Sequence, residues 1–470
     1  MCQYTYRISL TFLFLLSFAL LPTALAQSSE KPMNFVIVFA DDLGYGDLGV
    51  YGHPTMHTPN LDRMAMEGQR WTNYYAAASV CTPSRAGLIT GRLPIRSGMT
   101  SHKSRVLFPN SVNGIPQTEL TLAEQLKQAG YTTACIGKWH LGHKEQYLPT
   151  NNGFDYYFGI PYSNDMDNVH SKRYREYYLN PDSIKTEYFN VPLLRNTEII
   201  ERPANQNNIT TRYSEEAVDF IKDNSDKPFF VYLAHNLPHI PLFASEDFKS
   251  SSERGLYGDV LKEIDHGVGQ IRATLEELGI AENTMIVFTS DNGPWLPFKT
   301  HGGSAGLLRA GKGTTFEGGM REPAIFWSPG NIKPKVVKGL GSTLDLFTTF
   351  SAIANVPVPN DRVIDGVDLS KTLFEGAESP RNSVLFYRGN EVYAARLGEY
   401  KAHFITQGEY GQFGKREEHE TPLLYNLSHD PSEQYDIATD HPEVIREIEA
   451  MVEAHRQNLV VGEDQLAERE

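Results

Sequence analysis

Residues Asn34 to Asp42 read N-F-V-I-V-F-A-D-D, an unbroken apolar run that ends in two acids. A continuous run of branched and aromatic residues is typical of a strand that is buried on both faces of a sheet. Similar runs recur at 132–136, 229–234 and 284–289, and helix-like patterns at 120–129 and 257–278 alternate with them. This alternation predicts an α/β fold, with a mainly parallel sheet covered by helices on both faces.

Polar residues follow each of these four runs. Asp41-Asp42 follow the first run, G-K-W-H at 137–140 the second, H-N-L-P-H at 235–239 the third, and S-D-N-G at 290–293 the fourth. In open α/β sheets, ligands bind beyond the carboxyl ends of the strands. We therefore expect the acids, the amide, the lysine and the histidines of these segments to meet at one edge of the sheet.

The N-terminal residues have the layout of an export signal. One positive charge at Arg7 precedes an apolar run at 8–21, and small residues at 23–26 precede Gln27. This is typical of a cleavable secretory signal, and the run is short of the roughly 20 apolar residues that a membrane span requires. We expect a signal peptide at 1–26, a periplasmic or secreted protein, and no stable membrane anchor.

The net charge and the cysteine content indicate which partners and which kind of stabilisation to expect. A formal net charge of −15 argues against nucleic acid as the main partner. Of the three cysteines, Cys2 would leave with the signal, so the exported protein would rely on its core rather than on disulfides. Cys135 lies in an apolar run and is predicted to be a small buried strand residue.

Cys81 opens the segment C-T-P-S-R-A-G-L-I-T-G. Its C-x-P-x-R pattern has two interpretations, a chance turn or a modification site. The five-residue pattern alone does not decide between them.

Acids after two strands suggest a metal site. Asp41-Asp42 follow one predicted strand, and Asp291-Asn292 follow another. A turn or a helix cap is the structural alternative for a single aspartate. Three carboxylates and an amide oxygen, however, form a hard donor set that suits Ca²⁺ or Mg²⁺ rather than zinc. We favour the metal site.

Four further residues could carry chemistry. Lys138 and His140 are two residues apart, so on an extended backbone both side chains would face the same way; alone, they fit a solvent-exposed lysine and a packed histidine. His239 lies in a loop between prolines, which could fix its direction. Lys312 is flanked by glycines, which allow close approach of an anion. The spacing around Lys312 is not that of a nucleotide-binding loop.

The remainder of the chain divides into two parts. Residues 162–203 lack periodicity and are expected to form a long surface excursion that shapes a pocket or surface. Short alternating runs at 384–387, 391–396 and 400–405 predict a small antiparallel sheet, and 442–458 predict a terminal helix. We expect a catalytic domain over 27–375 and a smaller C-terminal α+β subdomain over 376–470.

Several long motifs together resemble the type I, formylglycine-dependent sulfatases, and within them the arylsulfatase A group and its bacterial relatives. The motifs are D-D-L-G-Y-G-D-L at 41–48, T-P-N-L-D-R-M-A at 58–65, C-T-P-S-R-A-G-L-I-T-G-R at 81–92, G-K-W-H-L-G at 137–142, S-D-N-G-P at 290–294 and G-K-G-T-T-F-E-G-G-M-R-E-P at 311–323. The resemblance implies an alkaline-phosphatase-like fold, in which helices sandwich a large mixed, mainly parallel sheet beside a smaller C-terminal antiparallel sheet with a helix.

The resemblance also implies a modified residue. A formylglycine-generating enzyme would read Cys81, Pro83 and Arg85 and oxidise Cys81 to formylglycine (3-oxoalanine). The hydrated aldehyde would offer one hydroxyl to attack sulfur and a second to expel sulfate, an exit that a plain cysteine or serine lacks.

The same resemblance implies roles for the strand-end residues. Asp41, Asp42, Asp291 and Asn292 would hold one calcium ion beside residue 81, which would itself contact the metal. The ion would bind a sulfate oxygen and favour the ionised nucleophile.

By the same resemblance, Arg85, Lys138 and Lys312 would hold the modified residue and the sulfate. His140 would contact the diol and accept its proton, and His239 with Lys312 would lie near the leaving oxygen, where a donor must neutralise the developing alkoxide.

The leading hypothesis is therefore an exported, calcium-dependent sulfatase, a sulfuric ester hydrolase acting on an organic sulfate monoester. A sulfated carbohydrate is favoured over a small aryl ester because the aromatic and polar excursion could form a sugar platform. Two alternatives stay open. They are a phosphate or phosphonate monoester hydrolase of the same superfamily and a catalytically silent carbohydrate-binding relative. The sequence makes no prediction of the oligomeric state.

Overall fold

The computed structural model describes residues 1–5, 31–169 and 184–470. Most of the expected signal peptide at 1–26, and residues 170–183 of the predicted excursion, lie outside the described residues. Residues Met1–Lys31 form one unit and Pro32–Glu470 another, and the second carries all the elements discussed below. Among the described residues, no helix is long and apolar enough to cross a membrane.

A ten-stranded sheet forms the centre of this unit, in the order β10-β2-β9-β8-β1-β7-β3-β4-β5-β6. The four long apolar runs of the sequence form its strands β1, β3, β7 and β8. The strands are β1 (Asn34–Ala40), β2 (Gln69–Tyr75), β3 (Thr132–Lys138), β4 (Tyr156–Ile160), β5 (Leu193–Arg195), β6 (Glu198–Glu201), β7 (Phe229–Ala234), β8 (Thr284–Ser290), β9 (Arg321–Trp327) and β10 (Lys335–Ser342).

The sheet is mixed but mainly parallel, which confirms the predicted fold class. Strands β8, β1, β7, β3 and β4 run parallel to one another. Strand β9 is antiparallel to both β8 and β2, while β10 is parallel to β2. The parallel block brings the carboxyl ends of β8, β1, β7 and β3 side by side at one edge.

Helices cover both faces of the sheet, and the side chains of β1 show why. Val36 and Val38 belong to one apolar core with residues of α6 (Ile209–Asp223) and α7 (Leu256–Glu277). Phe35 and Ile37 belong to a second core with residues of α4 (Leu122–Lys127) and α9 (Asp345–Ile353). Each fully buried apolar side chain of this kind stabilises the fold by about 1.5–3 kcal/mol, so an uninterrupted apolar strand is expected between two helical layers.

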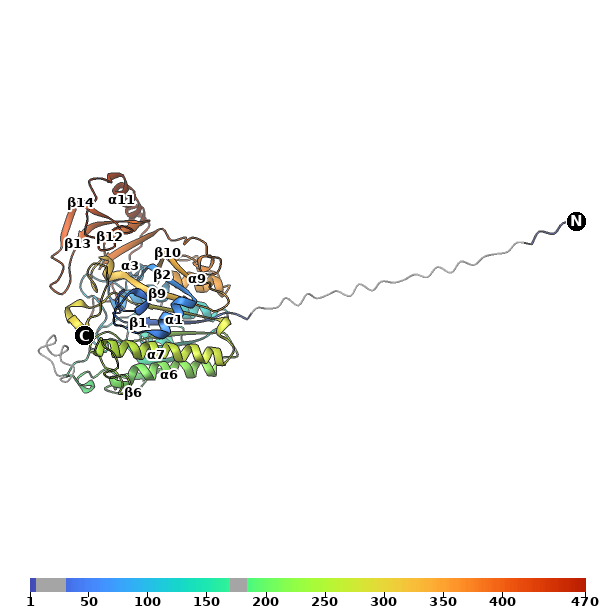
Figure 1. Ribbon diagram of the computed structural model, residues 1–470, viewed down its shortest axis with the longest axis horizontal. Coiled ribbons are helices and arrows are strands. Elements are labelled where there is room, and N and C mark those ends of the chain that lie inside the picture. The colour runs from blue at the N-terminus through green and yellow to red at the C-terminus, as the bar shows by residue number, and fades with distance from the viewer. Residues whose placement is uncertain (6–30, 170–183) are drawn as a thin grey trace. The chain divides into compact units, whose positions relative to one another are not determined.

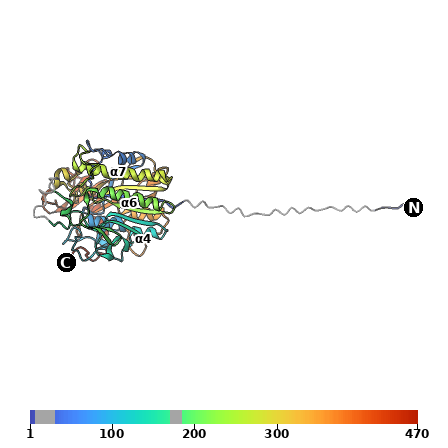
Figure 2. The same cartoon turned by 90° about the horizontal axis from the view of Figure 1, so that it is seen from below.

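Figure 1 shows α6 and α7 along one face of the sheet and α9 on the other, and Figure 2 shows α6 and α7 side by side. The helices are α1 (Pro59–Glu67), α2 (Cys81–Thr90), α3 (Pro94–Ser97), α4 (Leu122–Lys127), α6 (Ile209–Asp223), α7 (Leu256–Glu277), α8 (Glu317–Met320), α9 (Asp345–Ile353), α10 (Ser370–Phe374) and α11 (Pro442–Gln457).

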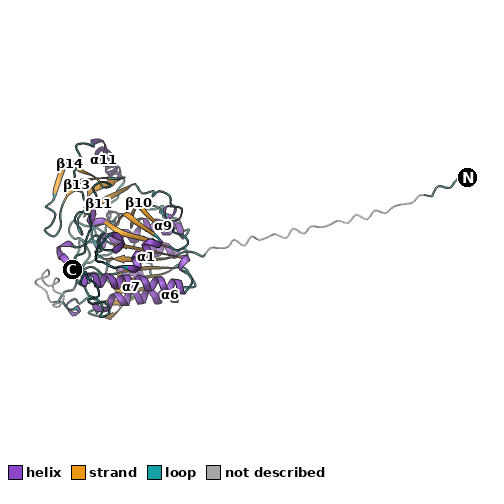
Figure 3. Cartoon of the chain, viewed as in Figure 1, coloured by secondary structure: helices purple, strands orange, loops and turns teal. Residues whose placement is uncertain are grey.

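A separate four-stranded antiparallel sheet follows, as predicted (Figure 3). Its strands are β11 (Ser383–Arg388), β12 (Glu391–Leu397), β13 (Tyr400–Thr406) and β14 (Glu417–Asn426). Helix α11 buries Ile445, Ile448 and Val452 in a core shared with Ala395 and Ala402 of the strands. Strand β14 begins with a polar run, E-E-H-E, so its sequence lacks the alternation of apolar and polar residues that predicts a strand.

The described part of the 162–203 excursion contains more regular structure than its sequence predicts. Strands β5 and β6 form an antiparallel pair that extends the sheet beyond β4. These strands are three and four residues long, which is too short for an alternating pattern to show.

Candidate active site

The strand-end residues meet as predicted. Asp41 and Asp42 follow β1, Lys138 is the last residue of β3, and Asp291 and Asn292 follow β8. All five side chains are buried. The close approach of β3 to β7 requires a glycine before Lys138, because a Cβ at Gly137 would lie 1.9 Å from the carbonyl oxygen of Ala234.

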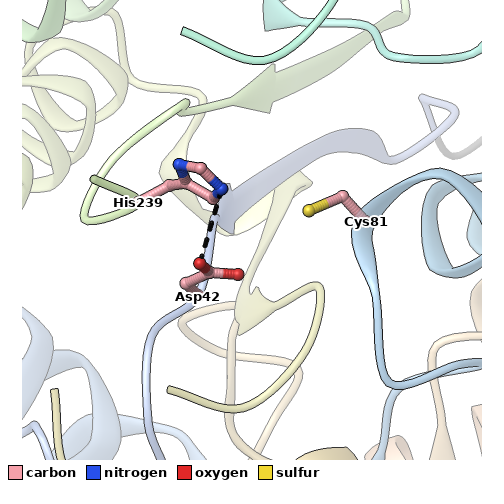
Figure 4. A group of neighbouring side chains, drawn as sticks. All are labelled: Asp42, Cys81 and His239. Atoms are coloured by element: carbon pink, nitrogen blue, oxygen red, sulfur yellow. Dashed lines mark ion pairs between the residues drawn. The ribbon is translucent and has the colours of Figure 1, made fainter. Parts of the chain in front are cut away.

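Cys81 is the first residue of α2, and every residue of that helix is buried. Its Sγ lies 3.4 Å from Asp41 Oδ1 and 3.5 Å from Lys312 Nζ. Figure 4 shows the sulfur beside Asp42 and His239. Burial and the Asp41 charge raise the pKa of the Cys81 thiol well above its usual value. An unmodified Cys81 therefore stays protonated at neutral pH, and a thiol is a poor nucleophile.

Each carboxylate at this edge has a cationic partner. Lys138 Nζ donates to Asp41 Oδ2. Lys312 Nζ lies 2.7 Å and 2.8 Å from the two oxygens of Asp42. Arg85 donates to Asp291 Oδ2 from Nη2 at 2.8 Å and from Nε at 3.1 Å. Three buried acids are thus matched by three buried cations, which leaves the cluster close to electrical neutrality.

The three carboxylates differ in their ionisation. Burial alone would raise the pKa of Asp41, but the charges of Lys138 and Arg85 hold it well below its usual range. Burial raises the pKa of Asp42 to about 6 against the charge of Lys312. Burial, together with the Asp41 charge, raises the pKa of Asp291 to about 7. One more cation in this cluster would stabilise the ionised forms of the last two.

The residues fit a hard metal ion. Oxygens of Asp41, Asp42 and Asp291 and the Cys81 sulfur lie within 4.8 Å of one another. Asn292 donates from Nδ2 to Asp42 Oδ1 at 2.7 Å, and its buried Oδ1 has no hydrogen-bond partner among the described residues. Oxygen-rich donors with free lone pairs suit Ca²⁺.

His140 does not continue the extended backbone of β3. Its φ of 59° is left-handed, so the extended backbone on which the alternation of Lys138 and His140 depends ends before His140. Its Nε2 lies 2.9 Å from the Leu107 carbonyl oxygen and must donate to it. Its buried Nδ1 has no partner among the described residues and can accept a proton. Burial and Lys138 hold the pKa of His140 well below its usual value, so the ring is neutral.

His239 follows β7 in the proline-braced loop. Its Nδ1 lies 2.5 Å from the Ile240 carbonyl oxygen, to which it donates. Its Nε2 lies 3.6 Å from Asp42 Oδ2 (dashed line in Figure 4). Burial and then the Lys312 charge lower the pKa of His239 well below its usual value. The ring is therefore neutral and carries its proton on Nδ1, so Nε2 holds none.

Sequence analysis missed two residues of the site. Ser163 Oγ lies 3.3 Å from Lys138 Nζ, and Ser163 ends a G-I-P-Y-S segment that could have marked it. The ring of Trp295 lies 5.2 Å from that of His239, and Lys312 Nζ lies 4.4 Å from its centre. No spacing pattern pointed to Trp295.

The C-terminal sheet holds the loop that carries Lys312. From β13, Lys401 Nζ donates to Thr315 O at 2.8 Å and pairs with Glu317 Oε1 and Glu433 Oε1, each at 2.9 Å. The Glu317 amide donates to Glu433 Oε2 at 2.7 Å. The side chains of Lys401, Glu317 and Glu433 are fully buried.

Known protein families and individual relatives match nearly the whole chain. The family described as Sulfatase matches residues 33–356, and the C-terminal region of aryl-sulfatase matches residues 379–470. Human arylsulfatase A is 42% identical over 92% of this chain and 89% of its own length. Rat N-acetylgalactosamine-6-sulfatase is 41% identical over 94% of this chain and 89% of its own length.

A solved structure of Ps i-CgsB in complex with k-i-k-neocarrahexaose is also similar, with a TM-score of 0.75 and 29% identity over 90% of this chain and 92% of that one.

Proposed function

This chain belongs to the sulfatase family and is a sulfuric ester hydrolase, and we propose that it releases sulfate from sulfated carbohydrates through a formylglycine at position 81. One observation carries the proposal. The Cys81 sulfur, at the start of a buried helix, lies 3.4 Å from Asp41 and 3.5 Å from Lys312 in a cluster of balanced acids and cations. Addition of a divalent cation would leave that cluster positive and ready for a compact anion.

The proposed modification would supply the nucleophile that an unmodified Cys81 lacks. A buried, protonated thiol is a weak nucleophile, whereas the hydrate of formylglycine would supply one hydroxyl to attack sulfur and a second through which sulfate is expelled. A formylglycine-generating enzyme is the partner that this requires, and Pro83 and Arg85 stand at the spacing that the C-x-P-x-R pattern demands.

The proposed metal is one calcium ion. Asp41, Asp42, Asp291 and Asn292 would hold it beside residue 81, where it would polarise a sulfate oxygen and favour the ionised nucleophile. Support comes from the oxygen donor set and from the unpartnered Asn292 Oδ1 in the described cluster.

Side chains of the protein would position the reacting groups, transfer the protons and stabilise the leaving oxygen. Arg85 and Lys138 fix the carboxylates and orient residue 81, and Lys312 faces the sulfate. His140 Nδ1, neutral and unpartnered among the described residues, would accept the proton of the diol when sulfate leaves. His239 and Lys312 would stabilise the departing alcohol oxygen from the other side.

Sulfated carbohydrate is the substrate class with the best support. One relative is named for 6-sulfated N-acetylgalactosamine, and the similar structure of Ps i-CgsB contains a neocarrahexaose. The sequence of residues 1–26 supports export to the periplasm or beyond the cell, where such glycans are met. The division into 27–375 and 376–470 stays a prediction.

Paired turnover tests this function. Wild-type protein, matured in a host with the formylglycine-generating enzyme, should release sulfate from a sulfate monoester much faster than phosphate from the matching phosphate or phosphonate ester. Cys81→Ala serves as the inactive control. A clear preference for the phosphorus ester would overturn the proposal, and the absence of all turnover would favour a silent binding protein.

A further inference from the structure

We propose that Trp295 and Tyr410 form a wall that binds a sugar ring of the substrate; this rests on the proposed function. The aromatic wall consists of these two side chains. Their rings lie 5.1 Å apart. Trp295 comes from the segment after β8, whereas Tyr410 comes from the β13–β14 loop of the C-terminal sheet.

The wall lies beside the groups that would meet the departing alcohol. The Trp295 ring lies 5.2 Å from the His239 ring and 4.4 Å from Lys312 Nζ. A sulfate held at residue 81 with its ester oxygen toward His239 and Lys312 therefore directs its alcohol portion toward Trp295 and Tyr410. The alcohol portion of a sulfated carbohydrate is a sugar ring.

The wall is accessible and has the surface that a sugar ring fits. Tyr410 is 41% exposed, and Trp295 is half-buried. A pyranose has an apolar face of C–H groups and a polar edge of hydroxyls. Aromatic faces bury the apolar face, while the Tyr410 hydroxyl can hydrogen-bond the edge.

Ion pairs hold the Tyr410 loop in place next to the catalytic loop. Glu409 pairs with Arg388 and, at 2.7 Å, with Arg105. The same two arginines donate to the Gly313 carbonyl oxygen, at 3.0 Å from Arg388 and 3.2 Å from Arg105. Gly313 directly follows Lys312, so the loop that presents Tyr410 is tied to the loop that presents Lys312. A wall fixed in this way is pre-organised, which reduces the entropy lost when a saccharide binds.

Kinetics of Tyr410→Ala test the wall. The saccharide is the one that wild-type protein desulfates fastest among galactose 6-sulfate, N-acetylgalactosamine 6-sulfate, N-acetylglucosamine 6-sulfate and neocarrahexaose. The second substrate is methyl sulfate, which has no ring. Tyr410→Ala should lower kcat/KM for the saccharide, relative to methyl sulfate, by about tenfold. Tyr435→Ala, which removes another exposed aromatic of the C-terminal region, should leave that ratio unchanged.

Fluorescence supplies a readout that does not need turnover. Of the four tryptophans, Trp71, Trp139 and Trp327 are at most 1% exposed, so Trp295 should dominate any change caused by a bound saccharide. Titration of the same saccharide into Cys81→Ala protein should change the emission, the Trp295→Phe version should lose the change, and the Tyr410→Ala version should bind about tenfold more weakly.

The outcomes separate the wall from the function on which it rests. If Tyr410→Ala protein desulfates the saccharide with an unchanged kcat/KM relative to methyl sulfate, the aromatic wall is refuted and the proposed sulfatase function stands. Turnover of methyl sulfate or 4-nitrophenyl sulfate with no saccharide turned over would overturn the wall together with the carbohydrate assignment. If no sulfate ester at all were hydrolysed, the proposed function itself would fail.

Discussion

Lys401→Met should destabilise the protein strongly, although Lys401 lies in the C-terminal sheet and not among the catalytic residues. Its fully buried ammonium lies 2.9 Å from Glu317 and 2.9 Å from Glu433. Removal leaves two buried carboxylates without their common cation. Loss of one partner from a buried ion pair typically costs about 3–5 kcal/mol.

The lower part of that range is expected, because other groups remain near the two acids. Arg321 lies 3.4 Å and Arg396 4.0 Å from Glu317, and His403 lies 2.6 Å from Glu433. We therefore predict a loss of about 3 kcal/mol in the free energy of unfolding. A fall in kcat for 4-nitrophenyl sulfate should accompany it, because Lys401 also anchors Thr315 in the loop that carries Lys312.

Urea denaturation of wild type and variant measures the first effect. Lys335→Met is the matched control, since Lys335 is exposed on β10 and its loss should change stability by less than about 0.5 kcal/mol. Adding Glu433→Gln to Lys401→Met should restore part of the stability by removing one uncompensated charge. A loss below about 1 kcal/mol for Lys401→Met would refute the view that this buried network holds the loop that carries Lys312 to the C-terminal sheet.

Three further outcomes are expected at the site. Cys81→Ala should abolish turnover while changing the free energy of unfolding by no more than about 1 kcal/mol, as urea denaturation would show; retained turnover would contradict the nucleophile. His239→Ala should slow an alkyl sulfate at least about tenfold more than 4-nitrophenyl sulfate, because only the poor leaving group needs a proton; equal losses in kcat would argue against the donor role. Calcium affinity of the metal-stripped protein, measured by calorimetry, should fall as the pH drops through about 7 and then about 6, where Asp291 and Asp42 take up protons that compete with the ion; a pH-independent affinity would contradict these ligands.

The sequence predicted the centre of the fold well, for a physical reason. Strands β1, β3, β7 and β8 are buried on both faces, so their residues form continuous apolar runs that stand out from the helices between them. Their parallel order then brings the polar residues that follow them to one edge. This is why Asp41 and Asp291, which are 250 positions apart in the chain, could be expected in one cluster.

Other features depend on contacts that no local pattern encodes. Strands β5 and β6 exist because the edge of β4 pairs with them, and their own sequences are too short to show a period. Strand β3 ends at Lys138, and the spacing of Lys138 and His140 does not encode the left-handed backbone at His140. Trp295 and Tyr410 come together from the segment after β8 and from the β13–β14 loop, so neither could be placed in the site from its neighbours in sequence.

Mass spectrometry of the tryptic peptide from Trp71 to Arg85 tests the central claim most directly. The protein should come from its native host, or from a host that supplies the formylglycine-generating enzyme. The account predicts that residue 81 carries the mass of the aldehyde or its hydrate and that the modified fraction tracks the specific activity. Fully active protein with only unmodified cysteine at position 81 would contradict it.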